Sequence, residues 1–362
     1  MINIQKITIE GYKGIDYFEY TPNKINIFVG RNNTGKSSIL EATALVATAT
    51  TGFYDKLGNN ILEGIIKRKG WKSLRYLIKL GQEQFKISAI TIGQEISLEA
   101  HYLQEGRKIL NEKIITLLQG YVRDYLGAVF PVENRKSLMR YREFFDEIVL
   151  SPMVVLTVLP IEKIAVIPEK EETVLISDTK SPADVLFYGY GMSELLDLGR
   201  LHDRLLPTAI FHRVIEYVRE RLPYLKDIRS RGEELWVYLF DLDEPLPISM
   251  IGDGTRETIR LAFISGVVRG GLIFLEEPEN HLHPGLYSVV AEGLVESVKR
   301  DGTQIFLSTH NEEFARSLIE LGSDLVNVVR LYRDAGNISY EILSSEEALE
   351  EMEKLQMDLR GP

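Results

Sequence analysis

The segment GRNNTGKS, at residues 30–37, has the residue types and the spacing of a loop that binds a triphosphate. In the pattern Gly-x4-Gly-Lys-Ser, backbone amides surround the phosphates, the lysine reaches the β- and γ-phosphates, and the serine hydroxyl meets a magnesium ion. Such a loop requires a strand before it and a helix after it, because the helix N-terminus attracts the anion. The apolar run at 24–29 and the helical pattern that begins near Gly35 provide both.

We therefore predict a site for ATP and Mg²⁺ in this loop, with Ser37 on the metal and Lys36 acting on the phosphates during catalysis. Asn33 stands where a left-handed backbone is expected, which asparagine tolerates better than most residues. The nucleotide-binding residues are expected to be Gly30, Arg31, Asn32, Asn33, Thr34, Gly35, Lys36, Ser37 and Ser38.

Two adjacent acids end a second apolar run, LIFLEE at 272–277. A buried strand would bring Glu276 and Glu277 to the carboxyl edge of an open α/β sheet, where such sheets bind ligands. We expect Glu276 to hold the magnesium ion and Glu277 to orient or deprotonate the attacking water. The alternative is an exposed acidic turn after a core strand, and the phosphate loop makes that the weaker interpretation.

A histidine, His310, directly follows a third apolar run, QIFLST at 304–309. This position predicts a side chain at the same sheet edge as the two acids, where it would meet the γ-phosphate or the attacking water. A lone histidine is more often structural than functional, so both interpretations stay open.

Strand patterns alternate with helix patterns around these residues. Apolar strands are expected at 24–29, 235–240, 271–277 and 304–309, and helices at 259–268 and 284–299. This alternation predicts an α/β fold with a mainly parallel core sheet covered on both faces. An acidic amphipathic helix is expected at 344–356, outside that core.

The chain between these parts reads as an inserted α+β lobe. We expect residues 1–60 and 230–362 to form the nucleotide-binding head, and residues 61–229 to form the insert. Within the insert, an alternating pattern at 83–103 predicts a hairpin, and helices are expected within 107–150 and 192–225.

Composition limits the class of protein. The 362 residues are 44% hydrophobic and 26% charged, which is the balance of a globular protein, and they include no cysteine for disulfides or thiolate metal sites. No apolar stretch approaches the roughly 20 residues that a membrane-spanning helix needs, so we expect a cytoplasmic protein without a membrane partner.

A local cluster of cations interrupts a chain whose net charge is −11. Residues 67–79 contain no acid, and Trp71 and Tyr76 lie among their basic side chains. Phosphate contact and base stacking use these residue types, so the cluster predicts a DNA-binding patch, although a solvated basic face is equally compatible. Its members are Lys67, Arg68, Lys69, Lys72, Arg75 and Lys79.

Taken together, Gly30–Ser37, IGDGTRETIRLA, LEEPENHLHP and FLSTH resemble the ABC-type ATPase heads of the SMC, RecF and OLD families. The resemblance is strongest to stand-alone AAA-type ATPases with the EPE-x-HLHP motif, and it covers residues 1–55 and 235–335. Roughly 50 residues follow His310, too few for the TOPRIM nuclease domain of OLD relatives. The fold class that the resemblance implies is a P-loop NTPase of ABC-ATPase type.

The resemblance also implies a nucleotide held between two heads, hence an ATP-dependent homodimer. Glu277 then matches the catalytic acid and His310 the switch histidine. The turn that would contact the partner's nucleotide is Gly252, Asp253 and Gly254.

This sequence departs from the family pattern in three places. Glu276 replaces the usual aspartate, which can shift the magnesium geometry and slow turnover. Gly252 stands where transporter-type heads have serine, so the γ-phosphate contact would rest on backbone amides and Ser249. No glutamine matches the Q-loop well, and Gln94 and the pair Ser177–Asp178 are weak candidates.

Three functions remain open from the sequence. The preferred one is an ATPase whose nucleotide-dependent dimerisation is coupled to DNA maintenance, repair or defence. The second is a slow-turnover ATP switch that acts on an effector protein, such as a separately encoded nuclease. The third, a transporter motor, is disfavoured by the signature sequence and the large insert.

Overall fold

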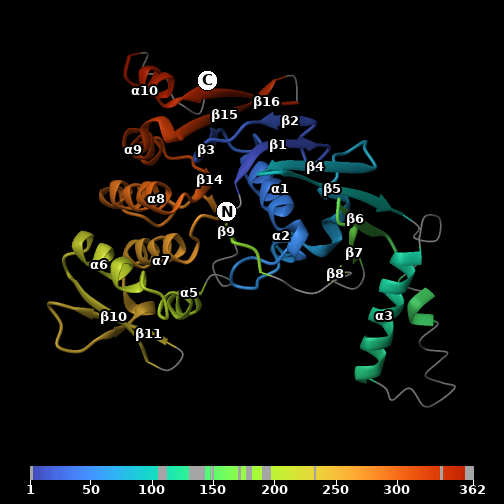
Figure 1. Cartoon of the computed structure of the whole chain (residues 1–362), viewed down its shortest axis with the longest axis horizontal. Helices are drawn as coiled ribbons and strands as arrows, with labels where there is room; N and C mark the ends of the chain where they lie inside the picture. The colour runs from blue at the N-terminus through green and yellow to red at the C-terminus, as the bar shows by residue number, and fades with distance from the viewer. Residues whose placement is uncertain are drawn as a thin grey trace.

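A computed structural model describes residues 3–104, 112–129, 143–146, 148, 151–169, 173–176, 182–189, 197–231, 234–334 and 337–354. One layer of structure lies on each side of a central sheet (Figure 1). In that view the antiparallel strands and α1 are to the right of the central sheet, and α6 to α9 are to its left.

The central sheet has six strands in the order β16-β15-β3-β14-β13-β9. Neighbouring strands from β15 to β9 are parallel, and only the edge strand β16 is antiparallel to its neighbour. This is the mainly parallel α/β core that the sequence predicts. The strands are β3 (Ile25–Gly30), β9 (Val185–Tyr188), β13 (Leu272–Glu276), β14 (Gln304–Ser308), β15 (Val326–Asp334) and β16 (Asn337–Ser344).

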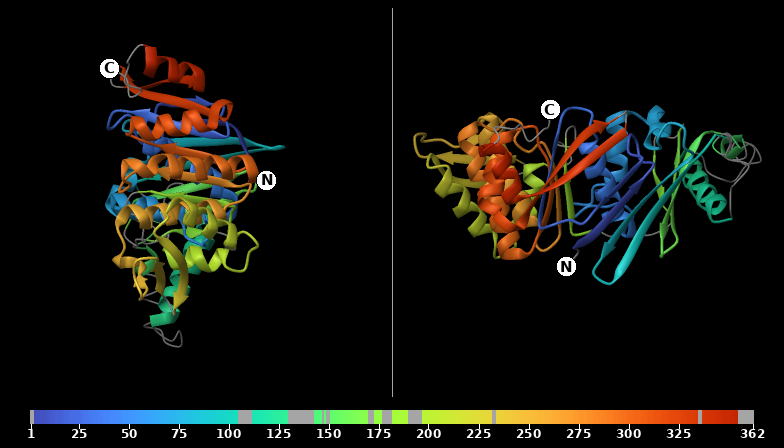
Figure 2. Two further views of the ribbon diagram at one scale, coloured as in Figure 1. Left: turned by 90° about the vertical axis from the view of Figure 1, so that its left-hand side faces the viewer. Right: turned by 90° about the horizontal axis from the view of Figure 1, so that it is seen from above.

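Both faces of this sheet are buried, which explains why its strands read as continuous apolar runs. On β13, Leu272 and Phe274 join one hydrophobic cluster with α1 (Lys36–Thr48) and the antiparallel sheet. Ile273 and Leu275, which point the other way, join a second cluster with the helical layer. The α1 helix therefore lies between two sheets, as the right-hand view of Figure 2 shows.

The antiparallel sheet has seven strands in the order β2-β1-β4-β5-β6-β7-β8. Its β4–β5 hairpin confirms the hairpin expected at 83–103. The strands are β1 (Ile4–Glu10), β2 (Tyr17–Tyr20), β4 (Gln84–Thr91), β5 (Gln94–Leu103), β6 (Met153–Leu159), β7 (Lys163–Pro168) and β8 (Leu175–Ile176). Beside it lie α2 (Ile61–Lys69), the 3₁₀ segment η2 (Trp71–Leu77) and α3 (Glu112–Val129).

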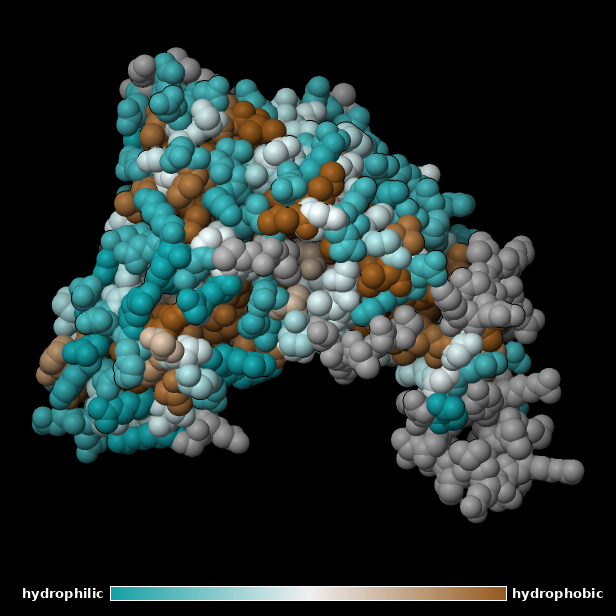
Figure 3. Space-filling view, viewed as in Figure 1, coloured by the Kyte–Doolittle hydropathy of each residue, from teal (hydrophilic) through white to brown (hydrophobic). Residues whose placement is uncertain are grey.

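The helical layer contains α5 (Leu198–Leu205), α6 (Phe211–Arg221), α7 (Asp253–Val267), α8 (Tyr287–Asp301) and α9 (Glu312–Gly322). A small antiparallel sheet, β10 (Leu225–Arg231), β11 (Glu234–Leu239) and β12 (Leu246–Pro247), extends from it. The surface over these elements is largely hydrophilic, with scattered apolar patches (Figure 3). Among the described helices, none has both the length and the apolar character needed to cross a membrane.

Three expectations differ from the structure. The run at 235–240 forms β11 of the small sheet and not a core strand, because its partners β10 and β12 are local hairpin neighbours. Strands within residues 61–229 pair with strands of the expected head, because β4 pairs with β1 and β9 pairs with β13. The described residues of this range therefore do not form a lobe with sheets of its own. The acidic helix α10 (Ser345–Lys354) is not outside the core, because it buries Ala348 and Met352 against the helical layer.

Candidate active site

The phosphate loop connects β3 directly to α1. Asn33 has a φ of 67°, which confirms the left-handed backbone expected there, and Gly35 has a φ of 97°. Gly30 needs to be glycine, because a Cβ atom there would lie 2.3 Å from the carbonyl oxygen of Leu331. Arg333 on β15 also contacts the loop, with its Nε donating to the carbonyl oxygen of Asn33 at 2.9 Å.

Lys36 is buried at the start of α1 and its ammonium group closes the loop. Its Nζ donates to the carbonyl oxygen of Gly30 at 2.8 Å and to that of Arg31 at 3.0 Å. Burial lowers the pKa of Lys36 to about 8, and the nearby carboxylates of Glu277, Glu279 and Glu276 oppose that shift. The lysine thus shares an electrostatic environment with the acids that follow β13.

Strand order brings the three sequence motifs to one sheet edge. β14 lies between β3 and β13, and Ser308 on β14 is opposite both Phe28 and Glu276. Since the strands are parallel, their carboxyl ends meet at the same edge. The phosphate loop, the acidic pair and His310 are therefore neighbours, as the sequence predicts.

Glu277 and His310 form a direct pair across this edge. The Oε1 atom of Glu277 lies 3.0 Å from Nε2 of His310, and its Oε2 accepts from Asn280 at 2.9 Å. Glu277 has a φ of 49°, and its backbone N–H donates to the carbonyl oxygen of Ser308 at 2.9 Å. Glu277 thus has a left-handed backbone, and His310 and Asn280 orient its carboxylate. Such a carboxylate can accept a proton from a water molecule.

Glu279 is a site residue that the sequence analysis did not single out. Its Oε1 accepts a 2.5 Å hydrogen bond from the Thr309 hydroxyl and a 3.1 Å bond from the backbone N–H of His310. Burial raises its pKa, which these hydrogen bonds oppose. Glu279 therefore joins the β13 loop to the β14 end that carries His310. The sequence does offer a signal for this residue, because Glu279 is a third acid that lies two positions after Glu277.

Glu276 is buried at the end of β13 and makes an ion pair with Arg68. The Arg68 Nη2 atom lies 2.6 Å from Glu276 Oε2, and Nη1 lies 3.4 Å from Oε1 of Glu41 on α1. Lys13 pairs with the same Glu41. The expectation that Arg68 lies on a DNA-binding surface is wrong, because only 10% of its side chain is exposed.

The other described members of the basic cluster also have partners. Lys67 pairs with Glu63 one helical turn earlier, at 2.6 Å, and Lys79 pairs with Asp16. Arg75 donates to the carbonyl oxygen of Gln82 at 2.7 Å and packs over the Tyr102 ring. The side chains of Lys69, Trp71 and Lys72 lie outside the described structure. The described cations Lys67, Arg68, Arg75 and Lys79 thus do not form one continuous cationic face.

The turn Gly252–Gly254 begins α7 and is exposed at Gly252 and Asp253. A Cβ at Gly252 would meet nothing within 4 Å, whereas one at Gly254 would lie 3.2 Å from the carbonyl oxygen of His281. The turn therefore lies beside the loop that follows Glu277, beyond β13. Ser249, just before it, donates weakly to Glu234 at 3.5 Å.

The residues at this edge fit a magnesium–triphosphate ligand. The backbone amides of residues 32, 33 and 35 find no acceptor among the described residues, and neither does the buried hydroxyl of Ser308. Donors of this kind in a loop before a helix suit phosphate oxygens. The Ser37 hydroxyl and the Glu276 carboxylate are oxygen donors, which Mg²⁺ prefers. Bound Mg²⁺ would neutralise charge on the β- and γ-phosphate oxygens.

The proposed Q-loop residues gain no support at this edge. Gln94 begins β5 in the hairpin of the antiparallel sheet. Ser177 and Asp178 lie outside the described residues.

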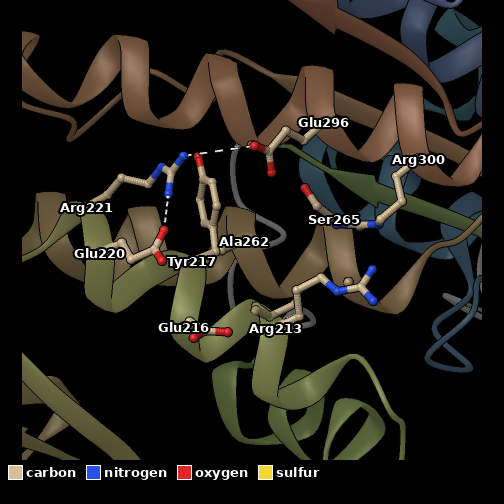
Figure 4. Close-up of a pocket in the computed structure, with 12 residues that line it drawn as sticks. Arg213, Glu216, Tyr217, Glu220, Arg221, Ala262, Ser265, Glu296 and Arg300 are labelled. Carbon is tan, nitrogen blue, oxygen red and sulfur yellow. Dashed lines mark hydrogen bonds and ion pairs between the residues drawn. The ribbon is translucent and has the colours of Figure 1, made fainter.

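A separate pocket of about 240 Å³ lies between α6, α7 and α8 (Figure 4). Arg221 lines it, with Glu220 at 2.8 Å and Glu296 at 3.9 Å, and stacks over Tyr217. None of its lining residues belongs to the phosphate loop or to the strand ends. It is therefore not the site of the phosphate chemistry.

Comparison with known proteins identifies two family models along the chain. Residues 2–148 match "AAA ATPase domain", and residues 172–316 match "AAA domain, putative AbiEii toxin, Type IV TA system". Together they include the phosphate loop, the acidic pair and His310.

Two curated relatives match different lengths of the chain. An "ATP/GTP phosphatase" of Helicobacter pylori is 21% identical over 87% of this chain and 87% of its own length. The "Old nuclease" of Escherichia phage P2 is 30% identical over 36% of this chain and 23% of its own length.

Solved structures of SMC heads share the fold. The Smc head of Pyrococcus furiosus with an extended coiled coil, bound to the C-terminal domain of ScpA, superposes with a TM-score of 0.54 at 11% identity, covering 99% of this chain and 100% of its own. An SmcHead bound to the C-winged helix domain of ScpA gives 0.53 at 14% identity, covering 96% and 99%.

Proposed function

We propose that this chain is an ABC-type P-loop ATPase of the SMC and OLD group that hydrolyses ATP between two copies of itself in a process that acts on DNA. The observation that carries the proposal is the sheet edge at which Lys36, Glu277 and His310 meet while the Gly252–Gly254 turn stays exposed. Such a protein would work in the cytoplasm.

Within one copy, the loop at 30–38 holds the triphosphate and Ser37 and Glu276 hold Mg²⁺. Glu277 is the general base, because its carboxylate ends the strand next to the phosphate loop and is oriented by Asn280 and His310. When Glu277 takes a proton from the attacking water it becomes neutral, and the His310 imidazole 3.0 Å away can accept that proton from it. The pair supports hydrolysis and not only binding.

The position of the Gly252–Gly254 turn supports the proposed dimer. Parallel strands lie about 4.8 Å apart, so β3 and β13 are separated by about 10 Å across β14. The turn lies beyond β13, against His281. The backbone amides of this turn, which begins the 15-residue helix α7 and is exposed at Gly252 and Asp253, suit the γ-phosphate of a nucleotide held by a second copy.

The DNA role rests on the relatives and on the exposed part of the 67–79 cluster. The phage Old protein is a nuclease by name, and it matches 36% of this chain. Among the cations of the cluster whose side chains the structure describes, Lys67 is the exposed one, with 61% of its side chain accessible. Arg68 has no part in this contact, since it faces Glu276.

A second candidate is a slow ATP switch that acts through an effector protein. The partnered state of Lys67, Arg68, Arg75 and Lys79 favours it, because each cation already has an acceptor and the net charge is −11. An anionic protein of this kind binds DNA only through a segregated patch.

Steady-state ATP turnover with and without DNA, together with DNA binding as a function of salt, separates the two candidates. A DNA-coupled ATPase should show DNA affinity that falls with salt, at a log–log slope of about −0.9 per phosphate contact on duplex DNA, and an altered turnover rate. Lys67→Glu should weaken binding on all sequences, because phosphate contacts carry no base information. Lack of binding to duplex and single strands at low salt with ATP present would leave the effector switch.

A further inference from the structure

Arg68 lies between two buried carboxylates that belong to different parts of the site. Glu276 ends the metal-binding strand β13, and Glu41 lies on α1, the helix that follows the phosphate loop. The exposed fractions of the three side chains are 10% for Arg68, 6% for Glu276 and 1% for Glu41. A buried guanidinium with two carboxylate neighbours is strongly held.

The backbone makes room for this contact at Gly189, which follows β9. A Cβ at that position would lie 2.7 Å from Glu276 Oε2 and 3.2 Å from Arg68 Nη1. Any other residue would push into the ion pair. The pairing is therefore built into the packing of β9 against β13 and α2.

Charge around Glu276 is weighted toward acids. Glu277 and Glu279 lie near enough to Lys36 to oppose the lowering of its pKa, and Glu41 lies on the other side of Arg68. Without Arg68, the carboxylates of Glu41 and Glu276 would face each other, with Lys13 still paired to Glu41. Two facing carboxylates of this kind attract a divalent cation.

We propose that Arg68 is an internal counter-ion that prevents Glu276 and Glu41 from holding a divalent cation before the nucleotide arrives. The guanidinium occupies Oε2 of Glu276 and so reduces the negative charge that a free cation meets. A metal already chelated by a triphosphate brings its own oxygen ligands and needs only part of the Glu276 charge. Arg68 would thus make metal loading depend on ATP.

The inference rests on the proposed role of Glu276 as a metal ligand, and its test uses Mn²⁺ alone. Binding of Mn²⁺ to the nucleotide-free protein is measured by electron paramagnetic resonance and by titration calorimetry. Removing a unit charge a few ångströms from a bound cation changes affinity by at least about tenfold at an effective dielectric constant near 20. R68Q should therefore bind Mn²⁺ at least about tenfold more tightly than the native protein.

Matched variants identify the cause. R68K keeps the charge and should bind Mn²⁺ as weakly as the native protein. K13Q removes a cation from Glu41 but leaves the Arg68–Glu276 contact, so its effect should be much smaller. R68Q combined with E276Q should lose the gain. If R68Q fails to fold, E41Q/R68Q compared with E41Q carries the same test with one acid fewer.

The outcomes separate this inference from the proposed function. If R68Q binds Mn²⁺ no more tightly than the native chain while E276Q still weakens Mn²⁺–ATP binding, Arg68 is not the counter-ion we propose. If E276Q binds Mn²⁺–ATP as tightly as the native protein, the metal role of Glu276 fails, and the inference fails with it.

Discussion

The imidazole Nε2 of His310 lies 3.0 Å from the Oε1 of Glu277, although 32 residues of chain, including all of α8, separate them. The contact exists because β13 and β14 are parallel neighbours whose carboxyl ends coincide. The strand order thus places the Glu277 carboxylate, which can accept a proton, within hydrogen-bond distance of the His310 imidazole.

We expect Glu277→Gln to bind ATP normally and to lose hydrolysis by about 10²–10⁴-fold, the range for a lost general base. The amide keeps the shape of the side chain and can still meet Asn280 and His310, but it cannot take a proton. Steady-state phosphate release and nucleotide titration measure the two effects. Glu276→Gln is the comparison, and a much larger loss of turnover there would exchange the roles of the two acids.

Glu279→Ala should destabilise the fold by about 1–3 kcal/mol, because two donors would lose a buried acceptor. It should also slow turnover, since the acceptor holds Thr309 and the backbone of His310. Urea unfolding and phosphate release report the two losses. Glu279→Gln keeps an acceptor oxygen and should be milder in both. Equal stability of the alanine variant and the native protein would show that these bonds contribute nothing.

ATP affinity should fall as the pH rises above about 8, because Lys36 loses its proton in that range and phosphate binds the ammonium form. The ordinary lysine pKa is 10.5, so between these values the unfolded chain holds the proton that the folded chain has released. The same group therefore adds stability to the nucleotide-free protein as the pH rises through this window. Nucleotide titrations from pH 7 to 10 check the first effect.

Lys36→Arg is the control for that pH dependence, since arginine stays protonated throughout. Its ATP affinity, even if lower, should not follow the native curve. Lys36→Ala should lose tight ATP binding while remaining folded, because Lys36 is the buried cation of the loop whereas Arg31 is exposed. A folded alanine variant with native affinity would remove the assignment of the loop.

The sequence could predict that the motifs share the carboxyl edge of one sheet, because each motif ends or follows an apolar run of five or six residues. Such runs mark buried parallel strands, and parallel strands bring their carboxyl ends together. The run at 235–240 has the same appearance but pairs antiparallel with β10, through a contact that its own letters do not encode. The sequence does not show which strand pairs with which, so it could not assign this strand to a sheet.

Arg68 shows the same limit at the site. In the sequence it belongs to a run of cations, and such runs indicate a solvated or DNA-binding face. In the fold its neighbours are Glu276 and Glu41, which are 208 and 27 residues away along the chain. Only the fold, which brings α2 near α1 and β13, reveals that Arg68 forms ion pairs with Glu41 and Glu276.

Asp253→Arg should prevent ATP-dependent association of two copies. The turn is exposed, and Asp253 already pairs with Arg256 at 2.5 Å, so the substitution removes that pair and adds a bulky cation where a partner would approach. Analytical ultracentrifugation with ATP measures the association. Glu244→Arg, in the described loop between β11 and β12, is a charge-matched comparison that should leave the dimer intact.

The most direct test of the account is the mass of the Glu277→Gln protein in solution with ATP and Mg²⁺, measured by light scattering at micromolar concentration. Blocked hydrolysis should hold the nucleotide between two heads, so we predict a particle of about twice the 41.3 kDa monomer mass that returns to monomer when ATP is omitted or Lys36 is replaced by alanine. A strictly monomeric species with ATP bound would contradict the shared site.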